Sequence, residues 1–164
     1  MKIKNILVSF TIAFIFWILL NNSFEPLRLL IGAGLSLILA LIFCSRCDVF
    51  SEIKLTPKAF FYTLAYLVVF LYELVKSNID VARRVITPSL PINPGIVEVK
   101  TKLKSKMGRM ILANSITLTP GTLTIDIQDD TLYIHWIDVQ TENIDEATQT
   151  IVRKFEKYLE KIYG

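Results

Sequence analysis

Uncharged apolar runs dominate the first half of the chain, whereas short alternating segments dominate the second half. No charged residue occurs from Asn5 to Phe24 or from Leu29 to Ser45. The first run, at about 1.5 Å per residue, is long enough to cross a hydrocarbon core of about 30 Å. The pattern therefore predicts a hairpin of two membrane helices, over about 5–24 and 29–45, with Pro26 in the polar turn between them.

A cleavable signal peptide is the competing interpretation of the first run. The Asn-Asn-Ser sequence at 21–23 does not offer the small-residue cleavage site that such a peptide needs, and a second apolar run follows at once. In that second run, the small residues within 32–36 favour close contact with another helix. We therefore expect an uncleaved helical hairpin.

A third apolar segment begins near Pro57, which suits the first turn of a helix because its nitrogen carries no hydrogen to leave unpaired there. Thr56 is the expected N-cap. The segment is uncharged over 59–72 and becomes amphipathic towards Ile86. We expect one long helix over 57–86 that leaves the bilayer in its later turns and lies against the membrane surface or a neighbouring subunit.

Basic residues flank all three apolar segments, and such residues prefer the cytoplasmic side of a membrane. Three full crossings cannot place every basic cluster on that side, so the choice between two and three crossings stays open at this point. We expect a multi-pass protein of the cytoplasmic (inner) membrane with a cytoplasmic C-terminal domain. The basic residues concerned are Lys2, Lys4, Arg46, Lys54, Lys58, Arg83, Arg84 and the run after Lys100.

Prolines occur at every third position in the segment 87–95, which reads TPSLPINPG. They end the preceding helix and favour an extended backbone. The segment therefore predicts a neck between a membrane part, residues 1–86, and a small domain, residues 96–164.

Alternating and helical spacings follow one another in the small domain. A Pro-Gly turn at 120–121 precedes one strand, and an acidic turn at 129–130 joins it to the next. Residues 115–119 could form a strand of their own, but an ordinary Pro-Gly turn twists the wrong way for a tight hairpin, so the helix is extended towards them. The expected elements are a strand over 96–101, a helix over 103–118, and strands over 122–127 and 131–139.

An amphipathic helix closes the chain. Asn143 is its expected N-cap, with Glu146 three residues later. The resulting order β-α-β-β-α, with both helices on one face of the sheet, resembles a ferredoxin-like fold without its last strand. The fold class is therefore membrane α followed by a small α+β domain whose core is small enough to favour packing against a partner. The apolar stripe of the last helix comprises Ile144, Ala147, Ile151, Phe155, Leu159 and Ile162.

Composition limits the function classes. The chain has 164 residues, of which 52% are hydrophobic, and a formal net charge of +3. It is too apolar for an ordinary soluble domain and too short for a transporter with its own pore, which indicates an accessory membrane protein. No nucleophile elbow, phosphate loop or metal-ligand spacing occurs in the segment from Met110 to Val139. We predict no catalytic, cofactor-binding or metal-binding residue, no enzymatic activity and no bound small-molecule substrate.

Four features carry candidate chemistry. His135 is the only histidine, and a lone strand histidine is more often structural than a proton relay. For Glu73, the one acid near membrane depth, a surface ion pair or subunit contact is favoured over ion conduction. Cys44 and Cys47 are too few for a metal site, and reduced thiols are favoured over a disulfide or a partner-completed site. The basic run Lys100 to Arg109 favours anionic lipid headgroups or an acidic subunit surface over nucleic acid.

Two segments carry a resemblance to a known family. Asn114 to Thr122 reads NSITLTPGT, and Leu132 to Val139 reads LYIHWIDV. Both resemble the E subunit of Mrp-type multisubunit sodium/proton antiporters, as does the layout of short N-terminal helices, proline-rich neck and final amphipathic helix. We refer to these two segments together as the signature.

The resemblance implies a non-catalytic accessory or assembly subunit whose partners are other integral membrane subunits. Related modules occur in free antiporters and in membrane-bound hydrogenases and sulfur-reducing complexes of anaerobic archaea, and composition does not separate these hosts. In such complexes the ion pathways belong mainly to larger subunits. The alternative is a self-sufficient membrane-tethered regulatory or ligand-binding domain.

Overall fold

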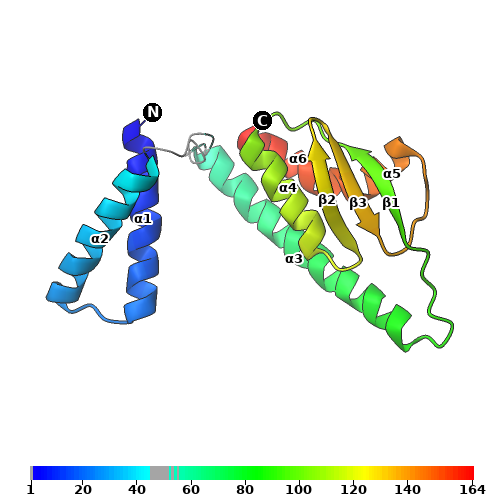
Figure 1. Ribbon diagram of the computed structural model, residues 1–164, viewed down its shortest axis with the longest axis horizontal. Coiled ribbons are helices and arrows are strands. Elements are labelled where there is room, and N and C mark those ends of the chain that lie inside the picture. The colour runs from blue at the N-terminus through cyan, green and yellow to red at the C-terminus, as the bar shows by residue number, and fades with distance from the viewer. Residues whose placement is uncertain (1, 45–51, 53, 55) are drawn as a thin grey trace. The chain divides into compact units, whose positions relative to one another are not determined.

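The computed structural model describes the chain except residues 1, 45–51, 53 and 55. Its contacts divide it into two compact units, Met1–Ile53 and Lys54–Gly164. The first unit holds helices α1 (Lys2–Asn21) and α2 (Pro26–Cys44), and the second begins with α3 (Pro57–Ile86) (Figure 1). The boundary between the units thus lies before the third helix, whereas the sequence pattern places a domain boundary after it, in the neck.

Small residues bring α1 and α2 together. Gly32, Ser36 and Ala40 recur every four residues along α2 and are buried against α1. A Cβ atom at Gly32 would lie 2.2 Å from the indole ring of Trp17, so only glycine allows this approach. The close contact expected of the small residues is confirmed at 32 and 36, whereas Gly34 has open space around it.

Helix α3 begins and ends where the sequence predicts. The side chain of Thr56 accepts a hydrogen bond from the backbone N–H of Ala59 at 3.1 Å, as an N-cap does. Each of α1, α2 and α3 is long and apolar enough to cross a membrane. Length and composition alone therefore do not separate α3 from the first two helices.

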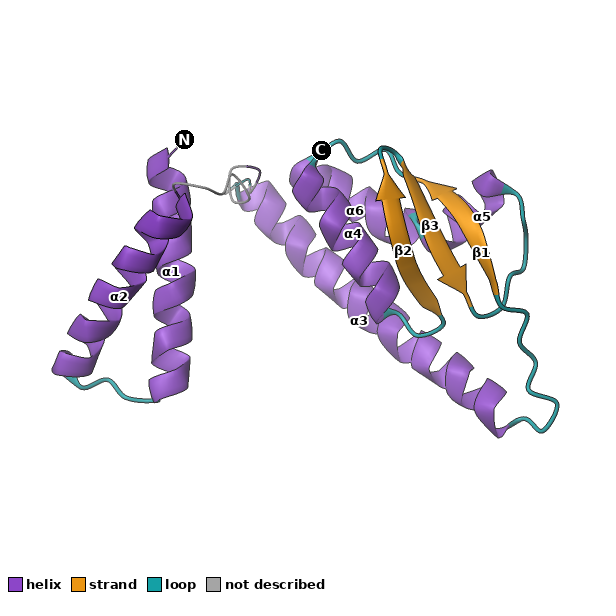
Figure 2. Cartoon of the chain, viewed as in Figure 1, coloured by secondary structure: helices purple, strands orange, loops and turns teal. Residues whose placement is uncertain are grey.

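The small domain has the predicted order of elements. Strand β1 (Gly95–Lys100) is followed by α4 (Lys106–Leu118), β2 (Thr122–Gln128) and β3 (Thr131–Trp136). The strands form an antiparallel sheet in the order β1-β3-β2 (Figure 2), which is a ferredoxin-like arrangement without the fourth strand.

The last segment forms two helices, α5 (Ile144–Ile151) and α6 (Arg153–Tyr163), and this corrects the prediction of one continuous helix. The break falls at Val152, whose side chain is fully buried. Helix α5 packs on β1, whereas α6 packs on α3 and α4. The segment bends because its two halves follow two different surfaces.

Helices on one face of the sheet enclose the hydrophobic core. Leu132, Ile134 and Trp136 alternate along β3 and point into it, as the sequence predicts. Most of the predicted stripe of the last helix is buried as well, whereas Ile144 is partly exposed. Aromatic side chains of α3 also pack against this core, which places α3 in the same unit as the small domain.

Candidate functional site

One face of α3 packs along α6. Its side chains follow the spacing of a helical stripe, from the buried Ala59 through Tyr62 and Tyr66 to Phe70. The ring centroids of Tyr66 and Phe70 each lie 6.4 Å from that of Phe155 in α6. This inward stripe makes the first half of α3 a wall of the small domain.

Polar contacts reinforce this packing. The ammonium group of Lys54 donates to the carbonyl oxygen of Gly164 at 2.8 Å, so the start of α3 meets the end of α6. The hydroxyl groups of Tyr66 and Ser115 share a hydrogen bond, and the Ser115 hydroxyl also lies within hydrogen-bond distance of the Ile111 carbonyl, 2.6 Å away. Helix α3 is thereby joined to both α6 and α4.

Glu73 forms an ion pair with Lys154 of α6. The Lys154 Nζ atom lies 2.9 Å from the Glu73 Oε2 atom, and the Glu73 side chain is only 13% exposed. The pair is intramolecular, and its partners are 81 residues apart in the chain. The sequence favoured an ion pair or a subunit contact for Glu73 but did not identify Lys154, because only the tertiary packing brings Lys154 near.

Arg84 fastens the far end of α3. Its guanidinium group lies 2.8 Å from the carboxylate of Asp80 and 2.9 Å from that of Asp138, just beyond β3. It also donates to the carbonyl oxygen of Pro91 at 2.7 Å. The neck is therefore held against α3 and the end of the sheet.

Between these two ion-paired sites lies a cleft of about 640 Å³. One wall is the second half of α3, with charged side chains that include Glu73 and Asp80. The other wall is the Pro-Gly turn together with the end of β3, so the two segments of the signature meet here. Gly121 in that turn has φ +92°, and a Cβ atom there would lie 3.0 Å from the Ile137 side chain.

The threonines of the signature close the end of α4. The Thr119 hydroxyl donates to the carbonyl oxygen of Ser115 at 2.7 Å, and the Thr122 hydroxyl donates to that of Ile116 at 2.7 Å. These two carbonyls belong to the last turn of the helix, where they also share the backbone N–H of Thr119. The signature therefore builds a turn and a cleft wall rather than a set of reactive groups.

The remaining sequence candidates lie elsewhere. His135 is on the outer face of the sheet, opposite the core, with Ile96 and Leu123 beside it in register. Cys44 is the last residue of α2, and Cys47 lies outside the described residues, so the expectation of reduced thiols stays a prediction. Within the part of the chain that the structure describes, no three His, Cys, Asp or Glu side chains gather as metal ligands would.

The basic run is partly used for internal contacts. The guanidinium group of Arg109 donates to the backbone carbonyls of Asp129 and Lys104, which joins the start of α4 to the turn between β2 and β3. The Lys100 ammonium lies 3.7 Å from the Asp130 carboxylate on the surface. Lysines of the run, among them Lys102, are exposed.

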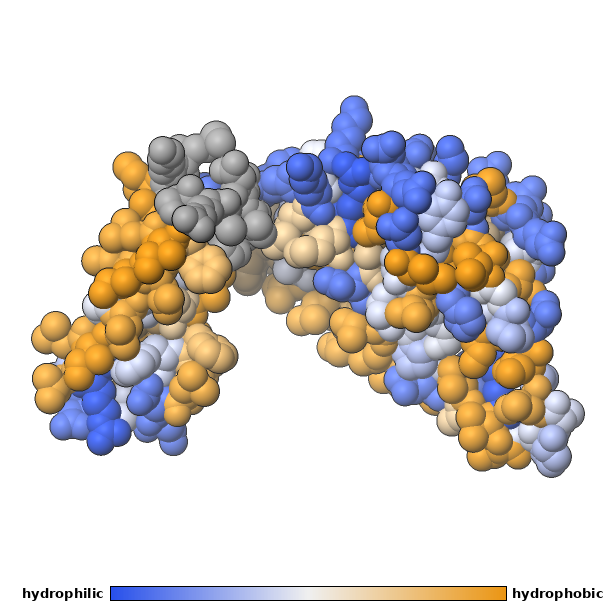
Figure 3. All heavy atoms as spheres, in the orientation of Figure 1, coloured by the Kyte–Doolittle hydropathy of each residue, from blue (hydrophilic) through white to orange (hydrophobic). Residues whose placement is uncertain are grey.

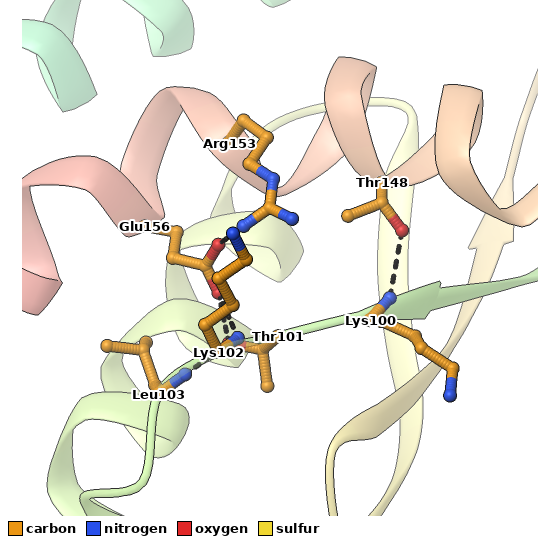
Figure 4. Close-up of polar contacts among 7 residues, drawn as sticks. All are labelled: Lys100, Thr101, Lys102, Leu103, Thr148, Arg153 and Glu156. Atoms are coloured by element: carbon orange, nitrogen blue, oxygen red, sulfur yellow. Dashed lines mark hydrogen bonds and ion pairs between the residues drawn. The ribbon is translucent and has the colours of Figure 1, made fainter.

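Sequence reasoning missed a buried carboxylate, Glu156, which is 1% exposed. Its Oε1 atom accepts from the Thr101 hydroxyl at 2.5 Å and from the Lys102 backbone N–H at 2.6 Å, and its Oε2 atom pairs with Arg153 (Figure 4). Glu156 lies four residues after the buried Val152, within the apolar stripe. An acid at such a position is the signal that could have revealed it.

Taken together, these features define a membrane protein in which a small α+β domain is built onto a third apolar helix, with a cleft beside it. Residues 10–162 match the family described as "Na+/H+ ion antiporter subunit". The chain therefore belongs to the E-subunit family of Mrp-type sodium/proton antiporters, as the signature predicts.

Individual relatives agree with this assignment. The chain is 35% identical to the Na(+)/H(+) antiporter subunit E1 of Staphylococcus haemolyticus over 164 residues, covering 96% of each protein. It is 32% identical to the subunit E1 of Staphylococcus aureus strain RF122 over 161 residues, covering 91% of this chain and 95% of the relative. Among solved structures, a chain of the membrane-bound sulfane sulfur reductase, an archaeal respiratory membrane complex, is 44% identical with a TM-score of 0.85, covering 98% of this chain and 99% of that one.

Proposed function

We propose that this chain is a non-catalytic subunit that helps to assemble a multisubunit membrane complex containing an Mrp-type antiporter module. This proposal is supported by the polar residues around the cleft, which contact other residues of the same chain. Glu73 and Arg84 are held in intramolecular ion pairs, and the signature threonines cap α4. In this proposal the signature shapes the turn and the cleft wall, and other membrane subunits dock on that surface.

We further propose that the host is a respiratory complex rather than a free antiporter. The chain is 44% identical to the chain of the archaeal respiratory complex and 35% identical to the staphylococcal subunit, with nearly complete coverage in both cases. The C-terminal domain lies on the cytoplasmic side in this proposal, as the basic residues favour.

A matched pair of variants tests the non-catalytic role. Glu73→Gln and Lys154→Gln each remove the same ion pair, one from the acidic side and one from the basic side. If the ion pair is structural, the two variant complexes should assemble alike in the native host membrane. After purification, each should exchange sodium for protons at a rate within about twofold of that of the parent complex. Loss of exchange in Glu73→Gln alone, at normal assembly, would show that the carboxylate lies on an ion path.

Native mass determination of the detergent-extracted protein tests the partnership itself. We expect this chain within a large assembly that contains other integral membrane subunits. A stable monomer extracted from the native host membrane would refute assembly and support the alternative of a self-sufficient tethered domain.

A further inference from the structure

The face of α3 that points away from the small domain is apolar along its whole length. Side chains at intervals of three and four residues, from Phe61 through Val68 and Val75 to Ile86, lie opposite the inward stripe. The first three are 69%, 67% and 59% exposed. Figure 3 shows hydrophobic residues along this side of the unit. This outward stripe comprises Phe61, Leu64, Val68, Leu71, Val75, Ile79, Ala82 and Ile86.

A cationic border runs along one side of the outward stripe. Lys58 and Lys76 are 18 residues apart, which is about five helical turns, so they lie on the same line of the helix surface. Arg83 continues this line, two turns after Lys76. All three are exposed. An apolar stripe bordered by basic residues is typical of a helix that lies in the plane of a membrane whose lipids are anionic.

Packing argues against a crossing by α3, although its length and hydropathy would permit one. The inward stripe is held against α6 from Lys54 to Glu73, and the far end is held by Arg84. A crossing α3 would therefore carry the exposed lysines of α6, Lys157 and Lys161, into hydrocarbon.

Charge and connectivity agree with two crossings. If α1 and α2 alone cross, Lys2, Lys4 and all residues after α2 lie on one side of the membrane, which removes the conflict among the basic clusters. The single basic residue left on the other side is Arg28, whose guanidinium group is paired with Glu25 at 2.9 Å. Only residues 45–56 lie between α2 and α3 in the sequence. Helix α3 therefore begins on the side of the membrane at which α2 ends.

We propose that α3 is an in-plane helix whose outward stripe is buried in the cytoplasmic leaflet, with Lys58, Lys76 and Arg83 on anionic lipid headgroups. The outward stripe thus contacts lipid, and α3 attaches the small domain to the membrane surface. This proposal does not depend on the chain's role in ion transport, because it concerns how the domain is seated.

Spin-label depth measurements on the purified complex test this arrangement. In a Cys44→Ser, Cys47→Ser background, labels are placed at Phe61→Cys, Val68→Cys and Val75→Cys, each one heptad apart on the outward stripe. The complex is reconstituted in vesicles of phosphatidylcholine and phosphatidylglycerol. Oxygen and a water-soluble nickel chelate then report depth and exposure at each position. Ile12→Cys in α1 is the deep reference, and Asn78→Cys, which lies outside the outward stripe and away from the cationic border, is the control.

An in-plane helix places the three labels at the same shallow depth, within about 3 Å of one another, with high oxygen access. A crossing helix, at about 1.5 Å rise per residue, would separate neighbouring labels by about 10 Å along the membrane normal. A bilayer-deep Val68 label would therefore overturn the proposal. Protection from both oxygen and nickel at all three positions would also overturn it, because it would show a protein partner on the stripe. Normal assembly of each labelled complex establishes that the variants fold.

Discussion

Removal of the buried Glu156 carboxylate tests how the small domain is held together. Glu156→Ala deletes the acceptor for three groups: the Thr101 hydroxyl, the Lys102 backbone N–H and the Arg153 guanidinium. Glu156→Gln retains one oxygen. That oxygen can still accept from Thr101 and Lys102, whereas the new amide N–H₂ group would face the donors of Arg153.

The two variants should differ in magnitude. A hydrogen bond to a charged group contributes about 1.5–3 kcal/mol, and a buried donor left without a partner costs about 1–3 kcal/mol. Arg153 is one-third exposed, so its ion pair contributes less, about 0.5–1 kcal/mol. We therefore expect Glu156→Ala to lower the free energy of unfolding by about 3–5 kcal/mol and Glu156→Gln by about 1–2 kcal/mol.

Urea unfolding of the full chain in detergent measures this difference. The chain has two tryptophans, so a Trp17→Phe background leaves Trp136 of β3 as the reporter of the small domain. Asp130→Asn is the matched control, because it removes the charge from the surface ion pair with Lys100 and should change stability by less than about 0.5 kcal/mol. Equal midpoints for Glu156→Ala and Asp130→Asn would refute the assigned role of the buried carboxylate.

Three further variants extend the test to the cleft, the α3 interface and the outer sheet face. Gly121→Val should reduce the amount of assembled complex on a native gel, because φ +92° and the nearby Ile137 side chain disfavour a β-branched residue by about 2–4 kcal/mol. Unchanged assembly would contradict a role of this turn in assembly. Tyr66→Phe should lower the urea midpoint by an amount equivalent to about 1 kcal/mol through loss of the Ser115 hydrogen bond, and no further loss is expected on adding Ser115→Ala. His135→Ala should leave sodium/proton exchange by the assembled complex unchanged, and abolished exchange would identify a proton relay.

Local signals predicted much of the fold. The start of α3 follows from Thr56 and Pro57, and the start of α5 follows from Asn143, whose side chain accepts from the N–H groups of Asp145 and Glu146. Capping and periodicity act within a few residues, so the sequence shows them directly. The break at Val152 was missed because it depends on which surfaces α5 and α6 meet, and those surfaces come from distant segments.

The cleft was much less predictable. The signature segments were recognisable, but their meeting with the second half of α3 depends on contacts such as Glu73–Lys154, across 81 residues. Glu156 was missed for a related reason. Two of its donors, the Thr101 hydroxyl and the Lys102 backbone N–H, lie on the loop after β1. Helical periodicity predicts which face of α6 carries Glu156 but not which donors it contacts.

The two faces of α3 explain why hydropathy alone suggests three crossings. The average hydropathy of α3 includes both the residues that face the small domain and the residues that face away from it. The residues that face the small domain are already shielded from water by the protein core. A charged side chain at the centre of a bilayer costs about 2.5–3.5 kcal/mol, so Lys157, Glu160 and Lys161 of α6 would together cost about 8–10 kcal/mol if α3 crossed with its domain attached. That cost is comparable with the whole stability of a small domain, about 5–15 kcal/mol. A crossing α3 would therefore have to release Tyr62, Tyr66 and Phe70 from the core, and the proposed in-plane arrangement avoids that cost.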